Sequence, residues 1–201
     1  MLKPHKHHKK QEDKQKKTKL ILAIIISLLM VLSVVTIVLD GGSFGAETTD
    51  YKGNTVSQSN LGYEIKTKEG QKIVFTNFPG IADSINTSFD KFYGAVITFN
   101  PNEDVNYMKF YETARFAIWR NLNLLNIPIG FAITENTTTN ESAYATLPIM
   151  DCNYENLTIV YLTISNTTSV IQKNNCIIVS GRDGGDLLLA KDALVYKYIF
   201  G

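Results

Sequence analysis

The feature that most constrains this chain is an apolar segment at residues 20–39, LILAIIISLLMVLSVVTIVL, which contains no charged residue. A helix of about 20 apolar residues just spans the hydrocarbon core of a bilayer. Eight lysines and two acids precede the segment, whereas Asp40 and two glycines follow it. Because positive charge stays on the cytoplasmic side, we expect a single-pass protein of the cell membrane with a cytoplasmic N-terminus and an extracellular C-terminal domain.

A cleaved secretory signal is the alternative to a retained signal-anchor. Signal peptides have an apolar core of about 7–15 residues that ends at small residues. The present segment is longer, and Ser43 and Gly45 would make a poor cleavage site before Ala46. We therefore predict four parts: a basic tail (1–19), a transmembrane anchor (20–39), a flexible stalk rich in Gly, Ser and Thr (40–60) and one external domain (61–201).

Charge is divided unevenly between these parts. The tail has a net charge of +6, and the remainder, with twelve basic and seventeen acidic residues, has −5. The tail favours anionic lipid headgroups, unless it is only a topology signal. An acidic domain argues against nucleic acid as a partner, because phosphate binding requires a basic face.

Histidine is confined to the tail, at His5, His7 and His8. Its absence from the external part excludes Ser–His–Asp and Cys–His catalysis there and removes the commonest zinc ligand. The tail histidines could bind a metal ion only weakly, because they lie among lysines. We therefore predict no catalytic residue, no cofactor and no metal site.

Apolar periodicity predicts an α+β fold in which the N-terminal transmembrane helix is followed by a two-layer domain with a mixed or antiparallel sheet and two main helices. Alternation at 63–67 and 73–76 around Gly70 predicts a hairpin. One long helix should begin at the Asn100 cap and end near residue 125. The last helix, 186–200, is apolar on almost every side, which indicates either burial in the core or contact with a partner or membrane. Further strands are expected at 95–99, 127–134, 157–165, 169–172 and 176–180.

The two cysteines, Cys152 and Cys176, both lie in the expected external part. An oxidising compartment and an even count predict one disulfide bond between them. The alternative is a pair of buried thiols.

Five N-glycosylation sequons also lie outside, a mild excess over chance, and they predict a glycoprotein. Their asparagines are Asn86, Asn136, Asn140, Asn156 and Asn166. The sequons at Asn136 and Asn140 fall in an expected surface loop and are the best candidates, whereas Asn156 precedes the strongest strand.

Arg115 is the most unusual single residue, because it falls within the apolar arc of the long helix. A buried arginine needs a carboxylate partner, so Arg115 forms either a buried ion pair or a carboxylate-binding pocket. The 181–186 loop, which precedes a helix, suits either a turn with a helix cap or an anion site assisted by Arg182. Residues 100–104 suit either a cap or calcium, although Val105 replaces the glycine of a calcium loop.

Several residues near the C-terminus form a familiar pattern: 175–181, 186–187, Ala190, Asp192, Leu194 and Tyr196. Over about 30 residues, together with the anchor topology, this pattern resembles uncharacterised archaeal single-pass membrane proteins with an external α+β domain. The resemblance implies an archaeal, externally displayed domain and no particular activity.

These features favour a non-catalytic surface protein whose external domain binds or scaffolds an envelope partner, or a second copy of itself. The alternatives are an extracellular carboxylate-based hydrolase of glycans or peptides, and an accessory subunit of a membrane complex.

Overall fold

The computed structural model describes residues 48–67, 70–136 and 144–201, all within one compact unit, Glu47–Gly201. The first strands are β1 (Thr48–Tyr51), β2 (Asn54–Ser59), β3 (Gly62–Lys66) and β4 (Lys72–Phe75). The later strands are β5 (Asn86–Ser88), β6 (Ala95–Phe99), β7 (Ile129–Phe131), β8 (Thr158–Ile164), β9 (Ser169–Lys173) and β10 (Cys176–Gly181). The helices are α2 (Pro79–Asp83), α3 (Val105–Asn123) and α4 (Gly184–Phe200).

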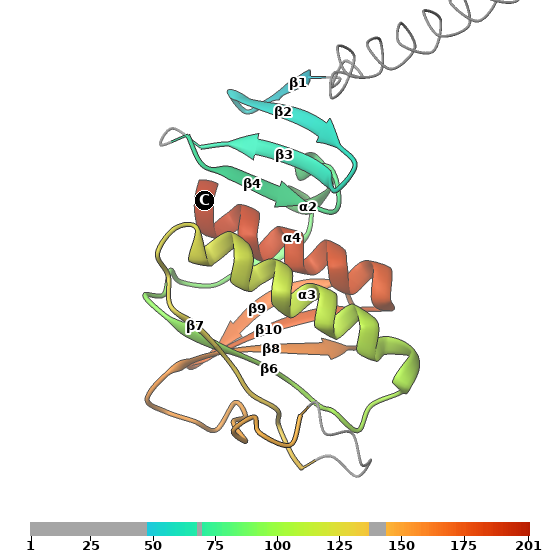
Figure 1. Ribbon diagram of the computed structural model, residues 1–201, viewed down its shortest axis with the longest axis vertical. Coiled ribbons are helices and arrows are strands. Elements are labelled where there is room, and N and C mark those ends of the chain that lie inside the picture. Colours follow the sequence, from blue (N-terminus) through green and yellow to red (C-terminus); the bar gives the residue numbers. More distant parts are fainter. Residues whose placement is uncertain (1–47, 68–69, 137–143) are drawn as a thin grey trace, which may run out of the picture. The chain divides into compact units, whose positions relative to one another are not determined.

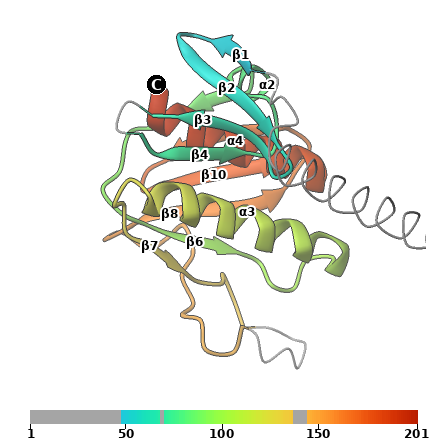
Figure 2. The same cartoon turned by 45° about the horizontal axis from the view of Figure 1, so that its top comes forward.

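The strands form two separate sheets. Strands β1 to β4 make an antiparallel sheet in sequence order, which we call the small sheet. The mixed sheet has the order β5-β9-β10-β8-β6-β7, with β10, β8, β6 and β7 parallel and β9 antiparallel to β10. Helices α3 and α4 lie side by side between the two sheets (Figure 1), and the same sandwiched arrangement is visible from a second direction (Figure 2).

The fold-class prediction was wrong. A two-layer domain with one sheet and two main helices was expected, whereas the described residues of the domain form two sheets and three helices. Strand patterns show which segments are extended but not which strands pair, so the hairpin of β3 and β4 was assigned to the same sheet as the rest. No helix among the described residues is both long and apolar enough to cross a bilayer. The segment predicted to do so, 20–39, lies outside them.

The predicted hairpin is confirmed, with Ile65 opposite Ile73. Two further strands, β1 and β2, occupy residues 48–59, which were predicted as part of a flexible stalk. Val56 is the one apolar residue of β2, so the sequence there has almost no strand signal, and the strand forms because it pairs with β3. The turn between them requires Gly62, whose φ is +122° and where a Cβ would lie 2.1 Å from the carbonyl oxygen of Phe75.

Both long helices begin at a different cap from the one predicted. The side chain of Asp104, not Asn100, accepts a backbone N–H in the first turn of α3, from Asn106. Asp183, not Asp186, caps α4 by accepting the backbone N–H of Asp186. Since each start contains more than one Asp or Asn within five residues, the sequence alone did not single out the cap.

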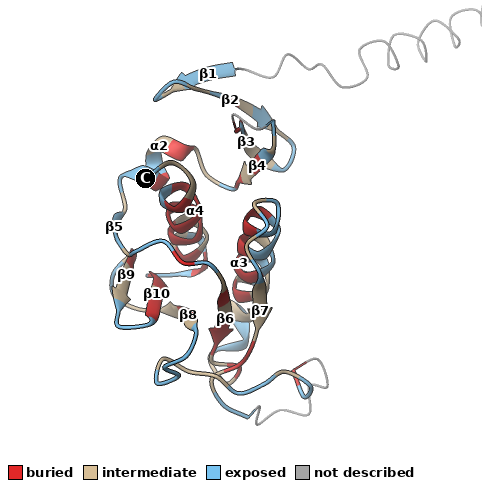
Figure 3. Cartoon of the chain, turned by 90° about the vertical axis from the view of Figure 1, so that its left-hand side faces the viewer, coloured by how far each residue is buried: buried red, intermediate tan, exposed pale blue. Residues whose placement is uncertain are grey.

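The core lies on both sides of α4, as its all-round apolar sequence predicted. Leu187, Leu194 and Val195 are fully buried. The red, buried positions of α4 and of the inner side of α3 face the strands and each other (Figure 3). α4 is therefore the central helix of the domain.

Candidate functional site

The parallel strands create a position where α/β sheets usually bind ligands. The chain leaves β6 through α3 to β7 on one side of β6, and it leaves β8 towards β9 and β10 on the other side. The carboxyl ends of β6 and β8 therefore border a topological switch point, and crevices at such points are common binding sites.

Glu103 and Tyr111 meet at this switch point. Glu103 follows β6 in the loop before α3, and the hydroxyl of Tyr111, on α3, donates a hydrogen bond to its carboxylate. The same hydroxyl accepts from the backbone N–H of Ile164 at the end of β8, at 3.1 Å. Tyr111 is fully buried and stacks on Phe99, with ring centroids 5.3 Å apart. The side chain of Tyr111 therefore links the loop after β6 to the end of β8.

Burial shifts the pKa values of the side chains at the switch point. Partial burial raises the pKa of Glu103, although the hydrogen bond from Tyr111 opposes that shift. Burial also raises the pKa of Tyr161 on β8, and the carboxylates of Glu103 and Glu135 add to that effect. The carboxyl group of Glu103 and two tyrosines therefore lie near the switch point, and burial makes Glu103 easier to protonate than an ordinary glutamate.

Arg115 lies on α3 inside a ring of aromatic side chains. Its Nη2 and Nε are 2.7 and 2.8 Å from Oε2 of Glu112, one turn earlier on the same helix. The guanidinium carbon is 5.0 Å from the ring centroids of Phe116 and Phe131. Arg115 thus has its carboxylate partner within α3. Nη1 of Arg115 and Oε1 of Glu112 are buried without a hydrogen-bond partner among the described residues.

The outer side of α3 and the neighbouring edge of β7 form an exposed aromatic surface, the α3–β7 face. Phe116 is 48% and Trp119 38% exposed, and residues three apart on a helix lie next to each other. The ring of Phe116 packs against Phe131 of β7 at 5.5 Å. Lys109 and Arg120 are exposed on the same side of α3.

Strand β7 contributes a sheet edge to this face. β7 pairs with β6 on one side only, and its other side pairs with no strand among the described residues. Pairing on that side begins only beyond β7, where Ile133 bridges to Ile149. Open strand edges expose backbone hydrogen-bonding groups to a partner chain.

The two predicted disulfide cysteines lie at disulfide distance, with sulfur atoms 1.96 Å and Cα atoms 5.1 Å apart. Cys176 begins β10 and is buried, whereas Cys152 lies in the segment before β8. The Thr98 hydroxyl of β6 donates to the carbonyl of Met150 in that same segment, at 2.9 Å. The sulfur contact therefore holds the chain before β8 against the mixed sheet.

The sequon asparagines are on the surface wherever the structure describes them. Asn86 lies in the edge strand β5, Asn136 follows the β7 segment, Asn156 precedes β8, and Asn166 lies between β8 and β9; all four are exposed. Asn140 lies outside the described residues, as do the tail histidines. Glycosylation stays a prediction, and Asn156, which was expected to be less accessible, is exposed as well.

The two candidate ion loops use their side chains for local structure. Asn100 and Asp104 accept backbone N–H groups at 2.8 and 2.9 Å. In the other loop, Nε of Arg182 lies 2.5 Å from the carboxylate of Asp186, and this guanidinium lowers the pKa of that carboxyl. Within the described ranges, no three His, Cys, Asp or Glu side chains gather as metal ligands would. Both loops therefore resemble turns with helix caps.

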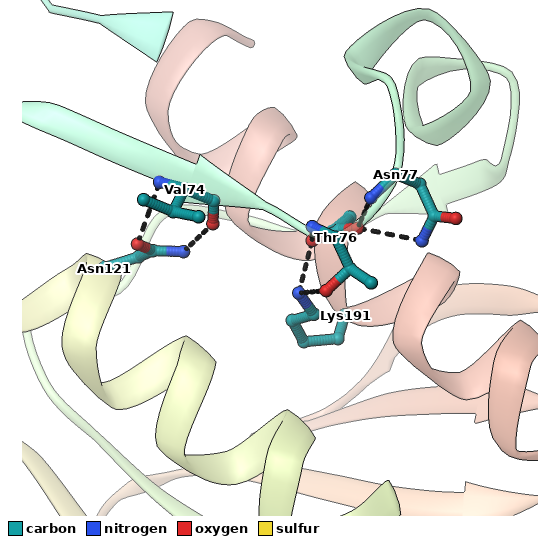
Figure 4. Close-up of polar contacts among 6 residues, drawn as sticks. Val74, Thr76, Asn77, Asn121 and Lys191 are labelled. Atoms are coloured by element: carbon teal, nitrogen blue, oxygen red, sulfur yellow. Dashed lines mark hydrogen bonds and ion pairs between the residues drawn. The ribbon is translucent and has the colours of Figure 1, made fainter. Parts of the chain in front are cut away.

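A buried charge pair joins the helices to the small sheet. Lys191 and Asp192 of α4 are 1% and 0% exposed and contact each other. Asp192 also accepts the backbone N–H groups of Thr76 and Asn77, at 3.2 and 2.7 Å. The ammonium of Lys191 donates to the hydroxyl of Thr76 at 3.0 Å, and Asn121 of α3 bonds both backbone groups of Val74 in the same region (Figure 4). These side chains satisfy the open edge of β4, so the pair is structural.

Sequence reasoning missed several of these residues. Glu103 was considered only as a cap or calcium ligand, and its place at the switch point depends on strand order. Phe116 and Trp119 carried a usable signal, because they lie on the polar side of the helical wheel among Lys109 and Arg120. Searches of known protein families, curated proteins and solved structures found no match to this chain. The resemblance to archaeal membrane proteins therefore stays a prediction.

Proposed function

We propose that this chain is a membrane-anchored cell-surface protein whose external domain binds a protein partner in the envelope and performs no catalysis. The support for anchoring is the apolar segment at 20–39 and the tail with a net charge of +6. The support for binding is the α3–β7 face.

The observation that carries the binding proposal is the exposed pair Phe116 and Trp119 beside the open edge of β7. Aromatic side chains supply most of the energy of protein interfaces when a partner excludes water from them. An open strand edge accepts an extended peptide by backbone hydrogen bonding. Together they suit a partner that lays an extended segment along β7 and covers the aromatic pair.

The charged side chains of the α3–β7 face indicate which residues the partner segment should contain. Lys109 and Arg120 flank the aromatic pair, whereas the carboxylate of Glu112, also on α3, is paired with Arg115. Lys109 and Arg120 form a basic stripe on α3, although the chain after residue 19 has a net charge of −5. Electrostatic complementarity therefore favours a partner segment with acidic residues.

Photo-crosslinking in intact cells tests this proposal. A photoreactive amino acid is placed at Thr113, which is exposed on α3 between Lys109 and Arg120, or at the control position Lys173, which is exposed on β9. Strands β10, β8 and β6 separate β9 from β7 in the mixed sheet. We expect the Thr113 probe to give one heteromeric adduct whose mapped peptide is rich in Asp and Glu. Trp119→Ala and Lys109→Glu should each reduce that adduct. Recovery of monomer only, or equal adducts from both positions, would overturn the proposal.

Topology has a separate test. Protease added to sealed cells should digest the domain and spare the lysine-rich tail. Protection of the domain would reverse the orientation, and a mature chain beginning near Ala46 would establish cleavage instead of anchoring.

The switch point supports a second candidate function, a hydrolase that uses carboxyl groups. Glu103 has a raised pKa and a tyrosine partner, as a proton-donating carboxyl group would need, and Glu135 is a second carboxylate nearby. Two open clefts in the domain do not add to this case. Among the described residues, Glu155 is the only carboxylate that lines one cleft, and no carboxylate lines the other.

Isolated envelope material tests the hydrolase. Wild-type protein should release new reducing ends or new peptide N-termini, and Glu103→Gln should not. Glu155→Gln is the matched control, because it removes an exposed carboxylate elsewhere. Equal release by wild type and Glu103→Gln would eliminate this candidate.

A further inference from the structure

A cleft of about 880 Å³ opens beside the last turn of α4. The β1–β2 turn, the connection from β3 to β4 and the residues after α3 form its other walls. Sites for small molecules commonly have a volume of about 300–1,000 Å³. The described residues that line this cleft belong neither to the α3–β7 face nor to the switch point, so a ligand here would be a further one.

The polar side chains of the cleft are mostly uncharged. No carboxylate among the described residues lines it, and the ammonium group of Lys52 lies 2.5 Å from Oδ2 of Asp83, which neutralises it. The hydroxyl of Thr67 and the amides of Asn54 and Asn126 are groups that both donate and accept hydrogen bonds. These groups suit a neutral ligand that itself contains both donors and acceptors.

Tyr196 contributes a buried hydroxyl that has no hydrogen-bond partner. The residue lines the cleft and is 4% exposed, and its hydroxyl makes no hydrogen bond with the described residues. A ligand can still reach this hydroxyl, because the fully covered side-chain atoms without a partner among those residues belong to Gln71, Glu112 and Arg115. Burial raises the pKa of Tyr196, and Asp83 adds to that shift, so the hydroxyl keeps its proton at neutral pH. Buried hydroxyls are normally hydrogen-bonded, so this one is available to a ligand.

Apolar side chains form the rest of the lining. Leu125, which follows α3, and Ile199 and Phe200, which end α4, are all partly exposed. The rings of Tyr196 and Phe200 have centroids 5.1 Å apart, so they contact each other and leave no slot for a flat aromatic ligand between them. A sugar ring has hydroxyl groups around its rim and a C–H face that packs on such side chains, so it matches both kinds of lining.

We propose that this cleft binds a neutral saccharide. One sugar hydroxyl would accept a hydrogen bond from the hydroxyl of Tyr196, and others would bond to Thr67 and to the amide of Asn126. The C–H face of the sugar would pack on Phe200 and Leu125.

A glycan array probed with the full-length protein, in a detergent without a sugar headgroup, tests the class of ligand. The array carries glucose, galactose, mannose and their N-acetyl derivatives, as monosaccharides and disaccharides, together with glucuronic and sialic acid. We expect binding to neutral sugars in preference to the two acids, and calorimetric titration with the best-bound sugar should give one site per chain. An array on which no neutral sugar is bound, or on which the acids are preferred, would contradict the proposal.

Two substitutions test the assigned groups. Tyr196→Phe removes only the unpartnered hydroxyl, so it should weaken sugar binding about five-fold without lowering the free energy of unfolding. Asn126→Gly removes an exposed amide at a position whose φ of +59° suits glycine, and it should weaken binding by a similar factor. Tyr154→Phe is the matched control, because it removes an exposed hydroxyl before β8, and it should leave the affinity unchanged. Equal affinities of wild type, Tyr196→Phe and Asn126→Gly would rule out this site.

Discussion

The buried pair Lys191–Asp192 yields the sharpest stability prediction, because its two halves are supported unequally. After Lys191→Met, the carboxylate of Asp192 keeps two backbone N–H groups and the side-chain amide of Asn77 as donors. After Asp192→Asn, the ammonium of Lys191 keeps neutral acceptors such as the hydroxyl of Thr76 but loses its buried counter-charge. The aspartate variant should therefore be the less stable of the two.

The cost of Asp192→Asn in unfolding free energy has an upper limit, because Lys191 can lose its proton in the variant. Burial lowers the pKa of Lys191 from its ordinary value of 10.5, and the carboxylate of Asp192 opposes that shift. Without the carboxylate, Lys191 can become neutral, which costs about 1.4 kcal/mol per pH unit below 10.5, or about 5 kcal/mol at pH 7. Loss of one partner of a buried pair usually costs about 3–5 kcal/mol, within this limit. Lys191→Met should cost about 1–3 kcal/mol.

Denaturant unfolding of the full-length protein at pH 7 and pH 9, each variant against wild type, is the assay. A lysine whose folded-state pKa is depressed gains stability as pH rises from that pKa towards 10.5. The cost of Asp192→Asn should therefore fall to about 2 kcal/mol or less at pH 9. The cost of Lys191→Met should not fall over the same range, because wild type keeps an amine whose lowered pKa adds stability as pH rises, whereas the variant has no amine at that position. A pH-independent cost of Asp192→Asn, or a cost at pH 7 below that of Lys191→Met, would refute the reasoning.

Three further predictions concern other contacts. Cys152→Ser/Cys176→Ser should lower the free energy of unfolding by about 3 kcal/mol, and an unchanged denaturation midpoint would exclude a bridge in the native protein. Asn121→Ala should cost about 1–3 kcal/mol, because it leaves both backbone groups of Val74 unpaired; hydrogen exchange at the Val74 amide should rise with it. Partial burial raises the pKa of Glu103, so its stabilising contribution is present below 4.5 and is lost as pH rises through the folded-state pKa. Glu103→Gln should therefore gain stability relative to wild type between pH 4 and pH 7 in urea titrations, and a constant difference would count against the raised pKa.

Local sequence patterns determined the individual elements of this protein well. The alternation at 63–67 and 73–76, the apolar faces of the two long helices and the strong strand before Ser165 each correspond to an element of the structure. The all-round apolar character of the last helix placed it in the centre, and the two cysteines were correctly paired at disulfide distance. The helices and strands depend on residues close together in the chain, and two cysteines allow only one pairing. The sequence therefore contains these features directly.

Tertiary structure alone decided the rest, because it depends on which elements meet. Strand pairing divided the domain into two sheets, and it made strands of residues 48–59, whose polar sequence resembles a stalk. The placement of β6 beside β8 brought Glu103 to a switch point through Tyr111. The packing of the small sheet on α4 supplied the N–H groups that make a buried Lys191–Asp192 pair tolerable. Each of these outcomes joins residues far apart in the chain, whose contact no local pattern can specify.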